Sequence, residues 1–399
     1  MSLSLLLAPL PGLFRAAWID GGRLQDLLVA WDEADAVRPG ALYWGRVAKA
    51  PPAADGVFVD LGKGLGGFLP RERGQPPAKE GERLLLRVKR AAEADKSLVV
   101  TRRVGRAAAP PAGTPSGLLA PGPSPLEQAL ARHRDRLGEI LVETAAERAR
   151  LAEGSDLPVA LIADRLGGFD LDGAIEALLS PVAELPSGAR LVIEPVTALT
   201  AIDVDAGRAL APKAGRRDPA RLRRAVNEEA LGELPRQVRL RNLGGQIAVD
   251  FLEPASKADL ARLRQDLQES FGSEVPATRL ASLGRGGLAI LERPRRGPSL
   301  AELATEPCCP SGGGRRASAR WSAFRLLSEL RRSLVGQGGA GSRRAYRGLV
   351  LRVSPGLGAV LAGPAADLLD DLQDRLGRAA DLEVLDGLED EASTGELLG

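Results

Sequence analysis

Short runs in which apolar and polar residues alternate dominate the early part of the chain. Between residues 40 and 104 these runs predict strands, separated by turns rich in proline, glycine or charged residues. The predicted strands are Ala41–Ala50, Val57–Leu61, Gly67–Pro70, Arg83–Arg90 and Ser97–Val104. Five strands in about 65 residues are typical of an OB-type barrel.

One of these strands predicts an outward aromatic ring. In Val57–Leu61 alternate residues face opposite sides, so the three aliphatic residues take the core and Phe58 faces outward. Phe68 lies in the next predicted strand. Two rings on one barrel face can stack nucleobases, with Lys96 or Arg46 available for phosphate. Ordinary packing at the rim of the barrel explains the two rings equally well.

The rest of the chain shows a linker and two mixed regions. Residues 107–125 are rich in alanine, proline and glycine, which is typical of a linker. A helical stretch is predicted over Leu126–Glu153, and strands alternate with helices over 158–294, which indicates an α/β domain. The last part predicts a small α/β domain with helices Arg320–Val335 and Ala365–Arg378 and strands Leu349–Val353 and Ala359–Ala362.

Two apolar segments of the central region end in carboxylates. In Ala198–Gly207 strand parity sends Asp203 and Asp205 to the same face, and in Gly244–Phe251 Asp250 follows three residues that should be buried. If these strands are neighbours in one sheet, three carboxylates meet at its edge, which favours a hard cation such as Mg²⁺. An aspartate at a strand end is also a common turn residue or helix cap.

The distribution of charge and the single histidine limit the kinds of partner and catalysis expected of this chain. The chain carries a net charge of only +2, but residues 208–241 hold ten Lys and Arg against four Asp and Glu, while 364–399 hold eleven acids and two arginines. The basic middle indicates a polyanionic partner and the acidic tail a solvated end. With a single histidine, Ser–His or Cys–His catalysis is disfavoured.

The positions of the cysteines and the residues at the N-terminus predict a protein of a reducing compartment. Adjacent Cys308 and Cys309 exclude a disulfide framework and fit a reducing environment. The apolar start of the chain lacks a basic leader segment and continues into strand-like residues, so a first strand is predicted there and no signal peptide. No apolar run approaches the length of a membrane span. We therefore expect a soluble, cytoplasmic protein without a membrane partner.

Four stretches together resemble the bacterial ribonuclease E/G endoribonucleases. They are Gly45–Pro70, which looks like the family's S1 RNA-binding domain; Leu185–Gly188 with Ile193–Pro195 and Ala198–Gly207; Gln237–Gly245 with Ile247–Phe251; and Pro307–Gly314, where the family has a cysteine link. Their order, with the barrel upstream of two catalytic segments, makes the resemblance specific. Weaker similarity extends on both sides.

The resemblance implies Mg²⁺-dependent hydrolysis of single-stranded RNA, with Mn²⁺ as an alternative ion, by an RNase H-like domain. Asp203 and Asp250 match the two metal-binding aspartates, and Asp205 stands where many members have asparagine. The S1 positions that hold RNA are matched by Phe58, Phe68 and Lys96. Arginines that could neutralise the RNA backbone are Arg239, Arg241, Arg279 and Arg285.

The sequence also departs from the family. The interval that holds a 5′-monophosphate sensor in larger members is here the linker, so we expect no such sensing. Cys309 keeps one position of the family's zinc link, glycine replaces the other, and adjacent Cys308 and Cys309 can hardly both bind one zinc ion. We therefore expect no zinc. A homodimer is compatible with the sequence, whereas a zinc-supported tetramer is not expected.

The predicted architecture is a multidomain α+β and α/β chain. Its parts are N-terminal strands 1–39 packing with the catalytic domain, an S1-type OB barrel 40–106, a linker 107–125, an RNase H-like catalytic domain 126–306, a degenerate cysteine link 307–319 and a small C-terminal α/β domain with an acidic tail 320–399. The leading hypothesis is an endoribonuclease. The alternatives are an RNA-binding paralogue that acts as an adaptor, and an S1 protein with an unrelated α/β domain.

Overall fold

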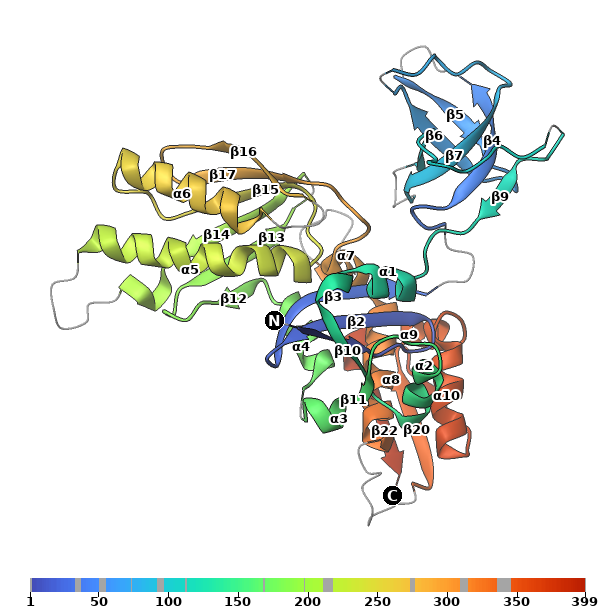
Figure 1. The fold of residues 1–399 in the computed structure, drawn as a ribbon. Coiled ribbons are helices and arrows are strands. Elements are labelled where there is room, and N and C mark those ends of the chain that lie inside the picture. Colours follow the sequence, from blue (N-terminus) through green and yellow to red (C-terminus); the bar gives the residue numbers. More distant parts are fainter. Residues whose placement is uncertain are drawn as a thin grey trace. The chain divides into compact units, whose positions relative to one another are not determined.

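The structure is a computed structural model. It describes residues 2–32, 37–49, 55–72, 74–91, 97–111, 113–167, 169–196, 198–210, 218–272, 277–308, 315–335 and 346–398. The chain forms two compact units, one of residues 32–134 and one of residues 1–31 with 135–399 (Figure 1). Each unit has its own hydrophobic core. The protein is therefore mixed α/β with a barrel as a separate body.

The unit of residues 32–134 is a closed five-stranded barrel. Its strands follow the order β5-β6-β8-β7-β4, and β5 pairs back onto β4 to close the ring. They are β4 (Leu42–Lys49), β5 (Gly56–Asp60), β6 (Gly66–Pro70), β7 (Arg83–Arg90) and β8 (Val99–Thr101). All five predicted strands are present, and the closed ring is consistent with an OB-like barrel.

The segment 107–125, predicted as a linker, contains a further strand of this unit. Residues Gly117–Ala120 form β9, which pairs antiparallel with the first half of β4. The linker prediction missed it because pairing with β4 supports this strand, and a local composition does not report such pairing. Helix α1 (Pro125–Ala131) follows and begins with a capping box in which Ser124 and Glu127 bond each other's backbone.

A mixed five-stranded sheet opens the second unit, in the order β11-β10-β1-β2-β3. Its strands are β1 (Leu3–Leu7), β2 (Leu13–Asp20), β3 (Arg23–Trp31), β10 (Leu137–Val142) and β11 (Val159–Leu161). The helix predicted over Leu126–Glu153 is wrong in its middle. There β10 pairs in parallel with β1 between α1, a 3₁₀ turn (Arg134–Arg136) and α2 (Ala145–Ala152). A distant strand thus overrides the local helical pattern.

The central sheet has six strands in the order β12-β13-β14-β15-β17-β16. They are β12 (Val182–Glu184), β13 (Arg190–Pro195), β14 (Thr200–Asp205), β15 (Gly245–Asp250), β16 (Arg279–Leu283) and β17 (Leu288–Arg293), preceded by α3 (Ile162–Arg165) and α4 (Leu171–Leu179). β14 and β15 run parallel, while the other neighbours in this sheet are antiparallel. The carboxyl ends of β14 and β15 therefore meet at one edge.

Helices α5 (Pro219–Leu240) and α6 (Lys257–Ser270) lie against one face of this sheet (Figure 1). The buried residues of β14 and β15, such as Ile202 and Val249, point toward these helices. Because successive strand residues face opposite sides, the remaining side chains of these strands lie on the other face. That second face carries the half-buried or exposed residues.

The C-terminal part packs helices on a three-stranded sheet, β21-β20-β22. Its elements include α7 (Leu300–Ala304), β18 (Thr305–Pro307), β19 (Arg315–Ala317), α8 (Ala319–Val335), β20 (Gly348–Val353), α9 (Pro355–Leu361), α10 (Ala366–Leu376), β21 (Asp381–Val384), η3 (Asp390–Ala392) and β22 (Thr394–Leu398). The remaining 3₁₀ turn of the described residues, η2 (Gly207–Leu210), follows β14. The strand predicted at Ala359–Ala362 is wrong, since Ser354 caps a helix there.

One hydrophobic core joins the two ends of the chain. Phe324 and Trp321 from α8 pack with residues of β2 and β3, and the Phe324 and Trp31 rings lie 5.1 Å apart between centroids. The same core includes Leu141 and Ile175. It therefore holds residues from both sides of the boundary predicted at residue 306. The acidic tail, expected to be a solvated end, contributes β21 and β22 to the sheet beside this core.

The helices of the protein are short or amphipathic. Across the described ranges, no helix combines the length and the apolar character that crossing a bilayer requires.

Candidate functional site

Asp203 and Asp250 lie side by side on the open face of the central sheet. They are register partners on the parallel strands β14 and β15, and both side chains are exposed. Neighbouring strands are separated by about 4.8 Å, so the two carboxylates are within reach of one small cation. Asp203 thus lies on the face opposite the buried Ile202 and Val204, as strand alternation predicts, and β14 and β15 are neighbours, as the predicted site requires.

The two carboxylates influence each other. Partial burial raises the pKa of Asp203 above its ordinary value, and the negative charges of Asp250 and Asp205 raise it further. Like charges disfavour ionisation because each destabilises the other's charged form. A bound cation would relieve this repulsion.

Asp205 has a different environment from this pair. Arg190 donates two hydrogen bonds to Asp205 Oδ2, from Nε at 2.9 Å and Nη2 at 2.5 Å, and the Gly207 N–H donates to Oδ1 at 2.8 Å. The Gly207 hydrogen bond and then the Arg190 contact lower the pKa of Asp205. The expected meeting of three equivalent carboxylates therefore becomes a pair plus one neutralised aspartate.

Arg190 was not among the predicted site residues, although the sequence held a signal for it. The hairpin of β13 and β14 places Arg190 directly opposite Asp205, and residues at equal distances from the hairpin turn pair across it. An opposite charge at that position indicates a cross-strand ion pair. The pair is half exposed, so its contribution to folding is small.

The chain just after Asp250 is fixed by Asn227 from α5. The Asn227 side chain is buried, its Nδ2 donates to the Leu252 carbonyl at 2.8 Å, and the Leu252 N–H donates to Asn227 Oδ1 at 3.1 Å. One amide thus satisfies both backbone groups of Leu252. This contact, which sequence reasoning missed, holds the end of β15 in place.

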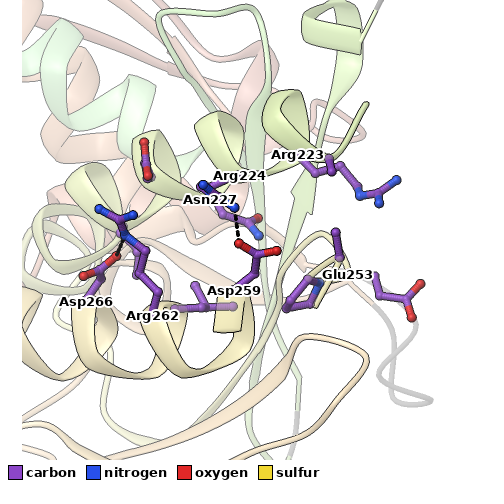
Figure 2. Close-up of a pocket in the computed structure, with 13 residues that line it drawn as sticks. Arg223, Arg224, Asn227, Glu253, Asp259, Arg262 and Asp266 are labelled. Carbon is purple, nitrogen blue, oxygen red and sulfur yellow. Dashed lines mark hydrogen bonds and ion pairs between the residues drawn. The ribbon is translucent and has the colours of Figure 1, made fainter. Parts of the chain in front are cut away.

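Figure 2 shows the hollow beside Asn227, between α5 and α6. Four of its charged groups form two pairs: Arg224 binds Asp259, and Arg262 Nε lies 3.8 Å from an Asp266 carboxylate oxygen. The cavity volume is only about 30 Å³. We interpret this hollow as a helix–helix contact that supports β15.

Replacing Asn227 by alanine should destabilise the protein by about 1–3 kcal/mol, because both backbone groups of the half-buried Leu252 lose their hydrogen-bond partner. The free energy of unfolding, measured by denaturant titration of the purified chain, checks this. Glu228→Ala, an exposed neighbour on the same helix, is the control and should change stability little. Equal stability of the two variants would contradict the positioning role of Asn227.

The four arginines proposed for the RNA backbone fall into different environments. Arg241 is buried and donates to Gln237 Oε1 at 2.9 Å and to the Ser180 carbonyl at 2.7 Å, and burial lowers its pKa to about 10. Arg239 Nε donates to the Gln25 carbonyl at 3.3 Å. The buried Arg241 does not fit a surface contact with a polyanion, whereas the half-buried Arg239 stays a proposed contact.

Arg279 and Arg285 lie at opposite ends of β16, the edge strand of the central sheet. Arg279 is exposed and forms an ion pair with Glu292 across β16 and β17. Arg285 is exposed on the turn between these strands. That turn lies against the end of β15, because the Phe251 N–H donates to the Gly287 carbonyl at 3.3 Å. Of the four, Arg285 is the one whose backbone lies beside the end of β15 that carries Asp250.

In the barrel, Phe58 and Phe68 face each other across β5 and β6. Their ring centroids are 5.5 Å apart at an interplanar angle of 61°, and Phe58 is 44% exposed, as strand parity predicts. A Cβ at Gly56 would lie 2.5 Å from Phe68 Cζ, so the Phe68 ring needs a glycine beneath it. Lys96, the third predicted residue of this surface, lies outside the described residues.

The described residues offer few side chains that could bind a metal ion together. Within those ranges, no cluster of three or more His, Cys, Asp or Glu side chains is arranged to hold a metal ion. The Asp203–Asp250 pair supplies two carboxylates, which fits Mg²⁺, an ion that keeps several waters and often binds through one or two carboxylates and substrate phosphates. Cys308 is exposed, and Cys309 lies outside the described residues.

The fold and the site define a mixed α/β protein with an OB-like barrel and a carboxylate pair on an open sheet face. Residues 139–296, which contain that pair, match the ribonuclease E/G family. The chain is 36% identical to ribonuclease E of Synechocystis sp. over 145 residues, 36% of this chain and 21% of that protein.

Two further relatives extend this similarity. Ribonuclease E of Escherichia coli is 32% identical over 165 residues, 40% of this chain and 15% of that protein. Ribonuclease G of Escherichia coli is 29% identical over 147 residues, 37% of this chain and 29% of that protein. The chain thus spans less than a third of the length of each of these three relatives.

Proposed function

We propose that this protein is a metal-dependent endoribonuclease that hydrolyses phosphodiester bonds in single-stranded RNA. The observation that carries the proposal is the register pairing of Asp203 with Asp250 on the open face of the central sheet. The match of residues 139–296 to the ribonuclease E/G family supports it, since the similar proteins are ribonucleases. In this proposal the central sheet is the RNase H-like catalytic domain and the barrel is an S1 domain.

Asp203 and Asp250 are the residues that would hold Mg²⁺. When bound, the ion would polarise a phosphoryl oxygen and lower the pKa of a water molecule. The two aspartates fix where the scissile phosphate sits, and ionised carboxylates beside each other favour that cation over an empty site. The Arg190 ion pair offsets the negative charge of Asp205 and so reduces its repulsion of the RNA.

The remaining residues would hold the RNA strand. Phe58 and Phe68 offer ring faces for stacking, and Lys96 stays a proposed phosphate contact. Arg285, close to the end of β15, is our choice for neutralising the backbone near the cleaved bond. We retain the expectation that cleavage does not require a 5′-monophosphate.

The test is cleavage of a fluorescent single-stranded oligoribonucleotide by the purified full chain. Cleavage should require added Mg²⁺ and stop with EDTA, whereas the corresponding DNA oligonucleotide should stay intact. Internal products, separated on a denaturing gel, distinguish an endonuclease from an exonuclease. Absence of cleavage over a wide panel of RNA sequences with Mg²⁺ or Mn²⁺ would overturn the proposed function.

Replacing Phe58 by alanine should weaken binding of single-stranded RNA by about 1–3 kcal/mol if the ring stacks on a base. Fluorescence anisotropy in EDTA measures the affinity without cleavage. Leu118→Ala is a matched control, because Leu118 is an exposed apolar residue on β9 of the same unit. If both variants bind RNA as tightly as the parent protein, Phe58 only packs against Phe68.

A further inference from the structure

Four residues form a transverse row on the open face of the central sheet. Val192 is the register partner of Asp203, Asp203 of Asp250, and Asp250 of Leu288. Because neighbouring strands lie about 4.8 Å apart, these four side chains follow one another across β13, β14, β15 and β17. The carboxylate pair is thus flanked by one apolar side chain on each side.

The residue beside Asp250 stands out by its exposure. Leu288 is 49% exposed, although it lies within a sheet strand, whereas Ile290 on the same face of β17 is half-buried. In the next row of the sheet the partners of Ile290 are Ala248 and then Ala201, which are small and uncharged. A single exposed leucine is ordinary. An exposed leucine that lies next to two carboxylates, with uncharged side chains in the neighbouring row, is less common than a single exposed leucine elsewhere on a surface.

The turn before β17 holds Leu288 beside Asp250. The Gly284 N–H donates to the Leu288 carbonyl at 2.8 Å, and the Phe251 N–H donates to the Gly287 carbonyl. Gly287 has φ +101°, and a Cβ there would clash with the Phe251 carbonyl oxygen. Only glycine fits at this position, so the close approach of the turn to β15 is built into the chain.

We propose that Leu288, backed by Ile290, is a platform for the nucleobase next to the scissile phosphate. The inference rests on the proposed function and adds the part of the substrate that this face holds. In single-stranded RNA the bases are free to splay out and to lie against apolar side chains. With the phosphate at the aspartates, a base adjacent to it lies over the flanking Leu288, and Arg285 on the preceding turn faces the backbone.

The platform has a consequence for specificity. Leu288 offers apolar area and no hydrogen-bonding group, so it recognises the face of a base and not its edge. The enzyme should therefore accept any of the four bases at the contacted position but should be impaired by an abasic nucleotide there. Fixing this base aligns the neighbouring phosphate with the aspartates, because positioning near the reacting geometry accelerates reaction.

The first test is a set of single substitutions in the full chain. Leu288→Ala should lower kcat/KM for a short oligoribonucleotide about tenfold, since most of the apolar contact is lost, whereas Leu288→Met should keep activity near the parent value. Val196→Ala is the matched control, because Val196 is 53% exposed on the β13–β14 turn and away from the row. An unchanged kcat/KM in Leu288→Ala would overturn the platform.

The second test combines a change in the protein with a change in the RNA substrate. After the cleaved bond is mapped, an abasic nucleotide is placed on its 5′ or 3′ side. On one side the abasic substrate should slow the parent protein about tenfold and should slow Leu288→Ala no further, since the contact is already gone. Independent, multiplying effects on both sides would overturn the proposal.

A binding measurement separates this inference from the proposed function. In the Asp203→Asn background, Leu288→Ala should weaken oligoribonucleotide binding severalfold relative to Val196→Ala, as measured by anisotropy. If the parent protein cleaves no RNA but this difference is present, the platform stands and the nuclease proposal falls. If the parent protein cleaves RNA and both variants have equal binding and equal kcat/KM, the nuclease proposal stands and the platform falls.

Discussion

Replacing Asp203 or Asp250 by asparagine is expected to lower the rate of RNA cleavage roughly a thousandfold or more. Asparagine keeps the shape of the side chain but removes the negative charge that a cation requires. Because the two residues are adjacent on neighbouring strands, loss of either leaves a single carboxylate on that row of the sheet. Initial rates of oligoribonucleotide cleavage in Mg²⁺ measure the effect.

The same variants should still bind RNA and remain folded. Ionised Asp203 and Asp250 repel each other, which is one cause of the raised pKa of Asp203, so Asp203→Asn removes an unfavourable interaction and the melting temperature should not fall. Asp266→Asn, in a surface ion pair on α6, is the control and should keep full activity. Equal, EDTA-insensitive cleavage by parent and variants would exclude the metal mechanism.

Replacing Phe324 by alanine should lower the free energy of unfolding by about 3–5 kcal/mol. Its ring is 1% exposed, contacts Trp31 at 5.1 Å between centroids and lies within 3.1 Å of the position that a Cβ on Gly12 would occupy. The cavity therefore opens between α8 and the N-terminal sheet. Denaturant unfolding followed by tryptophan fluorescence measures the loss, because Trp18 and Trp31 lie in this unit.

Leu382→Ala provides the comparison for Phe324→Ala. Leu382 is 42% exposed on β21, so its truncation should change stability by no more than about 0.5 kcal/mol. If Phe324→Ala costs as little as Leu382→Ala, the N-terminal sheet and the C-terminal helices do not share a core. A large cost accompanied by an unchanged barrel would locate the effect in the second unit.

Some features of the candidate site can be predicted from local sequence patterns, and others cannot. Alternation within β14 is enough to predict that Asp203 and Asp205 share one face, because side-chain direction in a strand depends only on parity. This alternation does not predict that Arg190 donates hydrogen bonds to Asp205. It also does not predict that the Asn227 side chain binds the backbone of Leu252 after Asp250. Both contacts depend on which elements become neighbours in the fold.

The barrel illustrates the same limit in a simpler form. Its five strands and the outward Phe58 follow from short alternating runs and turn residues, and the structure confirms them. Strand β9 was missed within the alanine- and proline-rich segment, since its stability comes from pairing with β4. The RNA-binding role of Phe58 and Phe68 remains a prediction.

By itself, the sequence determined the five strands of the barrel, helix α8, and the strand face that Asp203 shares with Asp205. These features depend on residue periodicity, which is a local property. Only the tertiary structure decided that β10 joins β1, that Phe324 closes a core with Trp31, and that Leu288 lies beside Asp250. Each of these joins residues far apart in the chain, and it is the burial and hydrogen bonding gained on contact, not local preference, that selects them.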